Sequence, residues 1–340
     1  MTRTASFTVI VPTYRRAMEL RRCLDGLARQ NVRPLEVIVV LRDVDAAAKE
    51  VVGAAAGIDG LPLRVLEIDR PGVVAALNLA LDNARGDFVA MTDDDAVPHA
   101  DWIERLEAAF AAFPNAGGVG GRDVLTLPDN PPPAELTEIV GTTTWYGRGH
   151  GNFHRGKGRP RKVQSLKGVN MAYRMAAVGS LRFDERLKGH GAQVSNEALF
   201  SGAVRCAGWE LIYDPAIQVE HIVGERPRDT ERNRMDGNVL REATHNTVLG
   251  LFEHRGPWTI FSSLAYALLI GSWNAPGLVS ALRWTLKGRR GMWTGLRNNY
   301  AGALDGWRTY ARTKAARGPD KFAVRRDLAT SSSLSPADDR

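Results

Sequence analysis

The sequence predicts an α/β fold, an open doubly wound sheet followed by a C-terminal helical extension. Short apolar runs rich in β-branched residues alternate with helical patterns over residues 7–113, and short connections join them. Residues 257–282 then contain no charged side chain, which indicates apolar helices. With 340 residues, of which 44% are hydrophobic, the chain can bury the core of one large α/β domain or two small ones.

Local patterns predict the individual elements. Four apolar runs are typical of buried parallel strands, at residues 7–11, 35–41, 63–68 and 87–91. Four segments have helical periodicity or are rich in alanine and leucine, at residues 17–29, 49–56, 73–84 and 101–113. The alternation ends near residue 115, and beyond it we expect strands at 116–127, 165–173 and 209–213 and a helix at 196–207.

The positive charge of the chain is concentrated in one segment. The formal net charge is +7, yet residues 283–318 carry nine Lys or Arg and one acid, so the other residues sum to −1. Because the rest of the chain has no basic field, nucleic acid is not expected as a partner. The two cysteines, Cys23 and Cys206, exclude a disulfide framework. The short polar start shows no apolar signal segment, so a cytoplasmic location is expected.

Polar residues follow three of the predicted strands, at residues 12–16, 42–45 and 93–95. In open α/β sheets, ligands bind beyond the carboxyl ends of the strands. Asp93, Asp94 and Asp95 are adjacent carboxylates, which repel one another unless a cation is present. Mg²⁺ and Mn²⁺ prefer carboxylate and phosphate oxygens, so these residues predict a divalent-metal site. A solvated turn is the alternative.

The order of motifs along the chain resembles the inverting family-two glycosyltransferases of the GT-A fold. The resemblance is close over residues 7–115 and looser over 165–222. The residues that carry it are Pro12-Thr13-Tyr14, Glu36, Ala76 with Asn78, Gly86-Asp87, and Asp93 with Asp95. It implies a GT-A type doubly wound mixed sheet, a nucleotide-sugar donor, and Mn²⁺ or Mg²⁺ as cofactor.

The same resemblance implies roles for residues of the donor half. The donor-binding residues would be Pro12, Thr13, Tyr14, Arg16, Asn78, Asp93 and Asp94, while Asp95 would hold the metal. Many relatives have Asp-Asp-Gly-Ser after the second strand, where this chain has Arg42-Asp43-Val44-Asp45. Asp43 or Asp45 would then read the base; we assign Asp45, with Arg42 adding positive charge beside the donor.

The second half of the chain is expected to supply the general base and a further metal ligand. An inverting transfer needs a base to deprotonate the acceptor hydroxyl. The family's acidic pair corresponds here to Asn196-Glu197, so Glu197 is the expected base; the alternative is a helix-start Glu favoured by the helix dipole. His221 corresponds to a family histidine near the metal and is the expected second ligand.

Acceptor contacts are expected from two segments. Gly168 and Asn170 lie in a stretch that resembles the family's Gly-x-Asn segment beside the acceptor, although turn chemistry explains such glycines equally well. Trp145 begins an aromatic and basic loop, residues 145–154, that suits contact with an acceptor or a lipid phosphate. A packed surface loop is the alternative.

The C-terminal segment has the composition of a membrane-surface region. Two short helices are expected, at 258–273 and 278–286, because Gly and Pro interrupt the apolar run. Five tryptophans lie at 258, 273, 284, 293 and 307, beside the basic segment. We expect in-plane attachment to an anionic membrane, on the inner face of the cell membrane. A helical subdomain buried against the catalytic core is the alternative.

These observations predict three regions and one function. Residues 1–225 would form the catalytic domain, with a nucleotide-sugar half (1–115) and an acceptor half (116–225). Residues 226–318 would form the membrane-associating region, and 319–340 a disordered tail. The expected enzyme moves a sugar from a nucleotide-sugar donor to a glycan or lipid-linked acceptor, in polysaccharide or glycolipid synthesis. A non-catalytic glycan- or lipid-binding protein is the alternative; a sugar nucleotidyltransferase is less favoured, because no Gly-rich loop follows the first strand.

Overall fold

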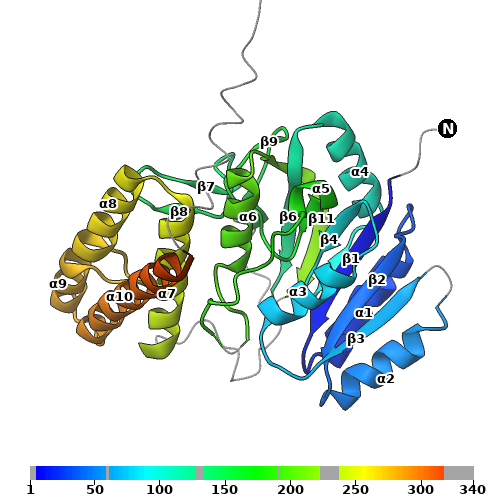
Figure 1. Ribbon diagram of the computed structural model, residues 1–340, viewed down its shortest axis with the longest axis horizontal. Helices are drawn as coiled ribbons and strands as arrows, with labels where there is room; N and C mark the ends of the chain where they lie inside the picture. The colour runs from blue at the N-terminus through cyan, green and yellow to red at the C-terminus, as the bar shows by residue number, and fades with distance from the viewer. Residues whose placement is uncertain (1–4, 59–60, 128–133, 190, 223–236, 318–340) are drawn as a thin grey trace, which may run out of the picture.

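The computed structural model describes residues 5–58, 61–127, 134–189, 191–222 and 237–317. The expected disordered tail at 319–340 lies outside the described residues. Figure 1 shows two parts: a sheet flanked by helices, which we call the catalytic unit (residues 5–222), and a group of helices, which we call the helical extension (residues 237–317).

The sheet of the catalytic unit is mixed, as expected, and confirms the predicted fold class. Four parallel strands form one side, β3 (Leu63–Ile68), β2 (Glu36–Arg42), β1 (Phe7–Thr13) and β4 (Phe88–Met91). The order continues with β10 (Met171–Arg174), β6 (Ala116–Thr126), β11 (Glu210–Ile222) and β5 (Ala96–Pro98). Strand β10 is antiparallel to both of its neighbours, so the parallel order breaks between β4 and β6.

Helices cover both faces of this sheet because successive strand side chains point to opposite faces. In β1, Val9 and Val11 belong to the cluster under the first face, while Ile10 belongs to the cluster under the second. The first face is covered by α1 (Ala17–Ala28), α2 (Ala46–Ala55) and α4 (Trp102–Ala112). The second is covered by α3 (Val73–Asn83), the short α5 (Met175–Val178) and α6 (Asn196–Cys206).

Strand β11 is much longer than the sequence predicts. The sequence predicts a strand at 209–213 and a separate strand-like segment at 217–220, and β11 joins the two and ends at Ile222, with a register shift between Asp214 and Gln218. Pro215 lies in that shift, where a residue without an N–H costs no ladder hydrogen bond. The continuation pairs His221 with Ala96 of β5, and so His221 lies next to Asp95.

The catalytic unit also contains short elements near the end of the sheet. Strand β9 (Arg161–Lys162) pairs with β11, and β7 (Thr142–Thr143) pairs with β8 (Gly149–His150) in a separate ribbon. A single 3₁₀ turn, η1 (Phe153–Arg155), follows that ribbon.

The helical extension consists of α7 (Gly237–His254), α8 (Pro257–Ala265), the π-helix η2 (Tyr266–Ile270), α9 (Leu278–Leu286) and α10 (Met292–Arg317). Helices α7 and α10 pack closely because α10 has glycines at the crossing: a Cβ on Gly302 would lie 2.4 Å from the Arg241 carbonyl oxygen. The single helix expected at 258–273 is instead α8 continued by the π-helix, which ends at Gly271 with φ 65°. None of the described helices combines the length and apolarity that crossing a membrane requires.

Candidate active site

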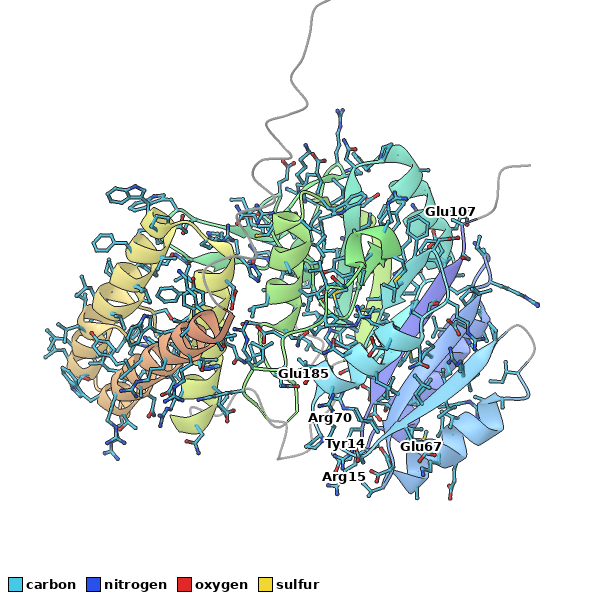
Figure 2. All side chains as sticks on the ribbon, in the orientation of Figure 1. Tyr14, Arg15, Glu67, Arg70, Glu107 and Glu185 are labelled. Atoms are coloured by element: carbon cyan, nitrogen blue, oxygen red, sulfur yellow. The ribbon has the colours of Figure 1, made fainter. Side chains whose placement is uncertain are left out.

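The polar segments after β1, β2 and β4 lie at one edge of the sheet. Strand β1 pairs in parallel with β2 on one side and with β4 on the other, so the three carboxyl ends meet. Figure 2 shows Tyr14 and Arg15 at this edge, with Arg70 and Glu185 beside them. Arg70 and Glu185 form an ion pair of 3.0 Å that joins the loop before α3 to the loop before α6.

Asp94, Thr13 and Arg16 form an internal cluster rather than a surface that faces a ligand. The Thr13 hydroxyl donates to Asp94 Oδ2 at 2.8 Å. Arg16 Nη1 donates to Asp94 Oδ1 at 3.0 Å and to Asp95 Oδ2 at 2.7 Å. Asp94 and Thr13 are buried, so their polar atoms serve the protein itself. These bonds hold Asp94 and the Thr13 hydroxyl within the protein, and the donor-binding role expected for both stays a prediction; Arg16 bridges Asp94 and Asp95.

His221 lies between two buried carboxylates, Asp95 in the turn before β5 and Asp123 in β6. Its Nε2 is 3.5 Å from Asp95 Oδ1, and its Nδ1 is 3.4 Å from Asp123 Oδ2. Asp123, in β6, is fully buried and also pairs with Lys167. Sequence reasoning missed Asp123 and Lys167; the available signal was that Asp123 is the one acid in β6.

The charges of this cluster shift the pKa values of its members in opposite directions. Burial alone would lower the pKa of His221, but the carboxylates of Asp123 and Asp95 outweigh it and raise the value to about 9. Burial acts against ionised Asp95, yet His221 and Arg16 lower its pKa to about 2. Burial dominates at Asp94 and raises its pKa to about 7 despite Arg16 and Thr13. The lower pKa of Asp95 means that Asp95 ionises at a lower pH than Asp94 does.

Asp95 and His221 offer two ligand atoms to a divalent ion, and the ion would displace the proton that the raised pKa of His221 retains. Within the described residues, Asp95 Oδ1 and His221 Nε2 are both buried and have no hydrogen-bond partner. Their separation of 3.5 Å is longer than an ordinary N–H···O bond, so the pair leaves polar capacity unused. No three His, Cys, Asp or Glu side chains in the described part of the chain form a complete ligand set. The chemistry of the two donors fits Mn²⁺ or Mg²⁺ with further ligands from phosphate and water.

The loop after β2 carries Asp43 and Asp45, the two candidates for reading the base. Asp45 is buried; its carboxylate accepts from Ala48 N at the start of α2 and from Arg15 N at 2.5 Å. Those bonds make Asp45 the N-cap of α2, and the base-reading role assigned to it stays a prediction. Asp43 instead lines an open cavity of about 490 Å³ at the same edge of the sheet. Arg42 and Arg15 lie over the Tyr14 ring, at 5.7 and 5.0 Å from its centre.

Two of the residues expected to bind the donor, Asn78 and Pro12, lie inside secondary-structure elements. Asn78 is buried in α3, and its amide accepts from Phe183 N at 2.8 Å and donates to Phe183 O at 2.9 Å. It ties α3 to the loop before α6, although part of its side chain borders the cavity of Asp43. Pro12 lies inside β1, opposite Val40 of β2, because the strand continues to Thr13. Asp93 is half-buried, which makes it the most accessible acid of the three.

Glu197 lies in the first turn of α6, at the end of a loop anchored to the donor half. Gln193 fixes this loop: its amide accepts from Val74 N at 3.1 Å and donates to Leu187 O at 3.0 Å. Ser195, two residues after Gln193, directly precedes α6 and has φ 75°, a left-handed backbone conformation that is uncommon for residues other than glycine. Glu197 is half-buried and close enough to Tyr173 to raise the pKa of that phenol, after burial. The structure thus places a carboxylate where α6 meets the loop.

The expected acceptor residues lie in three different environments. Asn170 is buried: its amide oxygen accepts from Trp102 Nε1 at 2.9 Å, and its amide nitrogen donates to Ile217 O at 3.0 Å. The acceptor role expected for Asn170 stays a prediction beside this internal role. A Cβ on Gly168 would meet no atom within 4 Å, so glycine is not required there for close approach. Trp145 is 77% exposed on a loop whose carbonyl accepts from Ser262 of α8 at 2.8 Å.

The sheet and the strand-edge site place the protein in the GT-A class. The chain is similar to a mannosyltransferase from Pyrobaculum calidifontis solved with GDP-Man and Mn²⁺, with a TM-score of 0.55, 20% identity, and 90% of this chain and 88% of that chain covered. It is also similar to Staphylococcus aureus TarS (residues 1–349) with UDP-GlcNAc, with a TM-score of 0.60, 15% identity, and coverage of 88% and 81%. At 20% and 15% identity, this structural similarity shows that the chain shares the fold of the two proteins.

The family follows from similarity in sequence. The model of glycosyl transferase family 2 matches residues 8–181, more than half of the chain. The chain belongs to glycosyl transferase family 2.

Two curated relatives come from Haloferax volcanii. The glycosyltransferase AglE is 30% identical over 139 residues, which span 40% of this chain and 45% of that protein. The glucosyl-dolichyl phosphate glucuronosyltransferase is 26% identical over 223 residues, 63% of this chain and 68% of that protein.

Proposed function

We propose that the protein is a metal-dependent, inverting glycosyltransferase that moves a sugar from a nucleotide-sugar donor to a lipid-linked acceptor. The observation that carries this proposal is the Asp95–His221 pair, two buried ligand atoms 3.5 Å apart that have no hydrogen-bond partner among the described residues. Family membership and the solved neighbours, which hold GDP-Man with Mn²⁺ and UDP-GlcNAc, support it.

The donor half of the proposed site uses residues of the strand edge. Asp95 and His221 would hold the divalent ion, which on binding neutralises the charge of the departing diphosphate. Asp93 would face the ribose, because it is the accessible acid. Tyr14, under the guanidinium groups of Arg15 and Arg42, offers a ring for the base, and Asp43 in the adjoining cavity would read its polar edge. Apart from His221, these residues lie within the nucleotide-sugar half, residues 1–115.

The acceptor half of the proposed site centres on Glu197. As general base, its carboxylate takes the proton of the acceptor hydroxyl while that oxygen bonds to the anomeric carbon. The bond from that carbon to the diphosphate breaks in the same step, which inverts the configuration. Gln193, four residues before Glu197, bonds to Val74 of the donor half, which supports this assignment.

The surface of the helical extension supports a lipid-linked acceptor over a free glycan. Helices α8 and α9 expose large apolar side chains, including Trp258 at 83%, Phe261 at 68% and Leu286 at 79%. Exposed basic residues lie on the same segment, among them Arg283 and Lys287. Apolar side chains beside cations suit in-plane attachment to an anionic membrane, which we propose on its cytoplasmic face. A relative named glucosyl-dolichyl phosphate glucuronosyltransferase agrees with such an acceptor.

One assay tests the proposal. The purified full chain is incubated with UDP- and GDP-sugars and a lipid extract, with Mn²⁺ or with a chelator, and release of the nucleoside diphosphate is followed. The proposal expects release from one donor class that requires the metal and rises with the extract. Tight nucleotide-sugar binding without release from any donor would instead indicate a non-catalytic binding protein.

A further inference from the structure

A second cavity, of about 470 Å³, lies between the catalytic unit and the helical extension. Its walls come from the loop of residues 142–151, from α6 and α7, and from α8 with the π-helix. Apolar side chains make up much of the wall, including Leu199, Val248, Leu251 and Leu264. Figure 1 shows α6 between the sheet and these helices. The cavity is separate from the strand edge that carries the donor site.

Two arginines line this cavity without an acidic partner. Arg205 is in the last turn of α6, and Arg255 follows α7. Arg255 donates to Gln164 Oε1 at 3.0 Å, and in the described part of the chain neither guanidinium forms an ion pair with a carboxylate. Burial, and then the nearby charge of Arg205, lower the pKa of Arg255. Two positively charged guanidinium groups that lie near each other in a half-buried site are stabilised when an anion binds between them.

The wall also contains an unused polar group. Ser263 of α8 is 7% exposed, and its hydroxyl is buried without a hydrogen-bond partner among the described residues. A buried hydroxyl without a partner costs free energy unless a bound molecule supplies one. The cavity therefore combines apolar walls, a free hydroxyl and two unpaired cations.

The cavity runs along α6 toward the proposed base. Its lining includes Ser195 and Ala198, which flank Glu197, as well as Arg205 in the last turn. Ten residues of α-helix separate Ser195 from Arg205, a distance of about 15 Å. A molecule held at Arg205 and extending along α6 would reach the turn that carries Glu197.

We propose that this cavity binds the phosphate-linked lipid portion of the acceptor, with its phosphate at Arg205 and Arg255 and its apolar chain between α6, α7 and α8. The inference rests on the proposed transfer to a lipid-linked acceptor and names where that acceptor is held. Charge complementarity selects an anionic head, and the leucine- and valine-lined walls select a hydrocarbon chain. A nucleotide is not the occupant, because the donor site lies at the strand edge.

Dodecyl phosphate below its micelle concentration is the probe, titrated into the full chain by calorimetry. The comparison ligands are inorganic phosphate, which lacks the chain, and a neutral polyethylene glycol dodecyl ether, which lacks the charge. The Arg205→Gln/Arg255→Gln double variant is expected to bind dodecyl phosphate at least about tenfold more weakly, because charge-assisted hydrogen bonds are lost. Arg297→Gln, an exposed arginine on α10, is the matched control and should bind as the wild type does.

The outcomes separate this inference from the proposed function. Binding of UDP or GDP with Mn²⁺ is measured on the same proteins and should not change in the double variant; if the double variant does not fold, Arg255→Gln alone is used. Equal binding of dodecyl phosphate by wild type and variant would overturn the inference, as would no binding at all. Equal binding of the neutral ether, or binding of inorganic phosphate as tight as that of dodecyl phosphate, would overturn it too. The binding of UDP or GDP with Mn²⁺ tests only the proposed donor site, and not the binding of the acceptor in this cavity.

Discussion

Asp95 Oδ1 and His221 Nε2 face each other across 3.5 Å in the protein interior. The contact depends on β5, which is three residues long and directly follows the acid cluster. Pairing of Ala96 with His221, and the bond from Ile222 N to Asp95 O at 2.9 Å, fix the two backbones side by side. Asp123 contacts the other ring nitrogen of His221, which is the arrangement that orients histidines at metal sites.

Glu197→Gln should reduce transfer by roughly 10²–10⁴-fold, because the variant keeps the size of the side chain but cannot accept the proton. Donor affinity should stay the same, since the base faces the acceptor. Steady-state rates and nucleotide binding measure the two effects. Glu104→Gln is the matched control, because Glu104 also lies in the first turn of a helix. A Glu197→Gln enzyme as active as the control would place the base elsewhere.

Asn170→Ala should destabilise the protein rather than weaken acceptor binding. The substitution leaves Trp102 Nε1 and the Ile217 carbonyl without their partner in the core, which costs about 2–4 kcal/mol. Urea unfolding measures this change, and the acceptor KM is measured at low temperature, where the variant is folded. Asn31→Ala, which removes an exposed hydrogen bond, should cost much less. An unchanged stability with a raised acceptor KM would instead support the acceptor role of Asn170.

His245 should make stability fall in mild acid. Its ring is fully buried, with Nδ1 at 2.9 Å from Asn246 Oδ1 and Nε2 at 2.9 Å from Thr309 Oγ1, and burial lowers its pKa. The unfolded chain, with an ordinary pKa near 6.5, then binds the extra proton as pH drops below that value. The free energy of unfolding should therefore decrease below about pH 6.5, by at most about 1.4 kcal/mol per pH unit for this one group.

Urea unfolding at pH 7.5, 6.5 and 5.5 checks the effect of His245. His245→Asn should reduce the loss of stability on acidification, whereas His99→Asn, at an exposed histidine, should leave it unchanged. The same loss in His245→Asn as in wild type would show that His245 does not contribute.

Trp258→Ser/Phe261→Ser should weaken binding to vesicles that contain anionic lipid. Both side chains are exposed on α8, and inserting such a side chain stabilises the bound state by about 1.5–3 kcal/mol, so binding should fall at least about tenfold. Vesicle flotation measures the bound fraction, which should also fall at high salt because the basic residues are screened. Met18→Ser/Leu35→Ser, at exposed apolar positions of the catalytic unit, should have no effect. Wild-type protein that does not float would contradict attachment.

The sequence predicts the first half of the fold well, because each element there has a strong local pattern. The strands and helices expected between residues 7 and 113 are confirmed within a few residues. The helical extension is harder to predict from the sequence, because α7 and α10 mix polar and apolar residues. The glycines that allow these helices to pack closely can be recognised only once the contact between the helices is known. The two parts of β11 are predicted as separate segments, because Pro215 interrupts the pattern between them.

The site shows the same division between local and tertiary information. Adjacent carboxylates at a strand end identify the acid cluster, and the pattern around His221 identifies the histidine. The partners of Asp94, Asn78 and Asn170 come from distant segments, so their internal roles leave no trace in local sequence. Asp123 is missed for the same reason: one acid in a strand becomes informative only when β11 places His221 beside it.

The most direct test of the Asp95–His221 site counts bound Mn²⁺. The solution signal of free Mn²⁺ in electron paramagnetic resonance disappears on binding, and titrations are run with UDP and with GDP. Wild type should bind one ion per chain, and Asp95→Asn and His221→Gln should each lower the Mn²⁺ affinity roughly 10–100-fold or more. Asp25→Asn, at an exposed ion pair on α1, should not change it. Equal Mn²⁺ affinity in wild type and both site variants, all shown to be folded, would contradict the account.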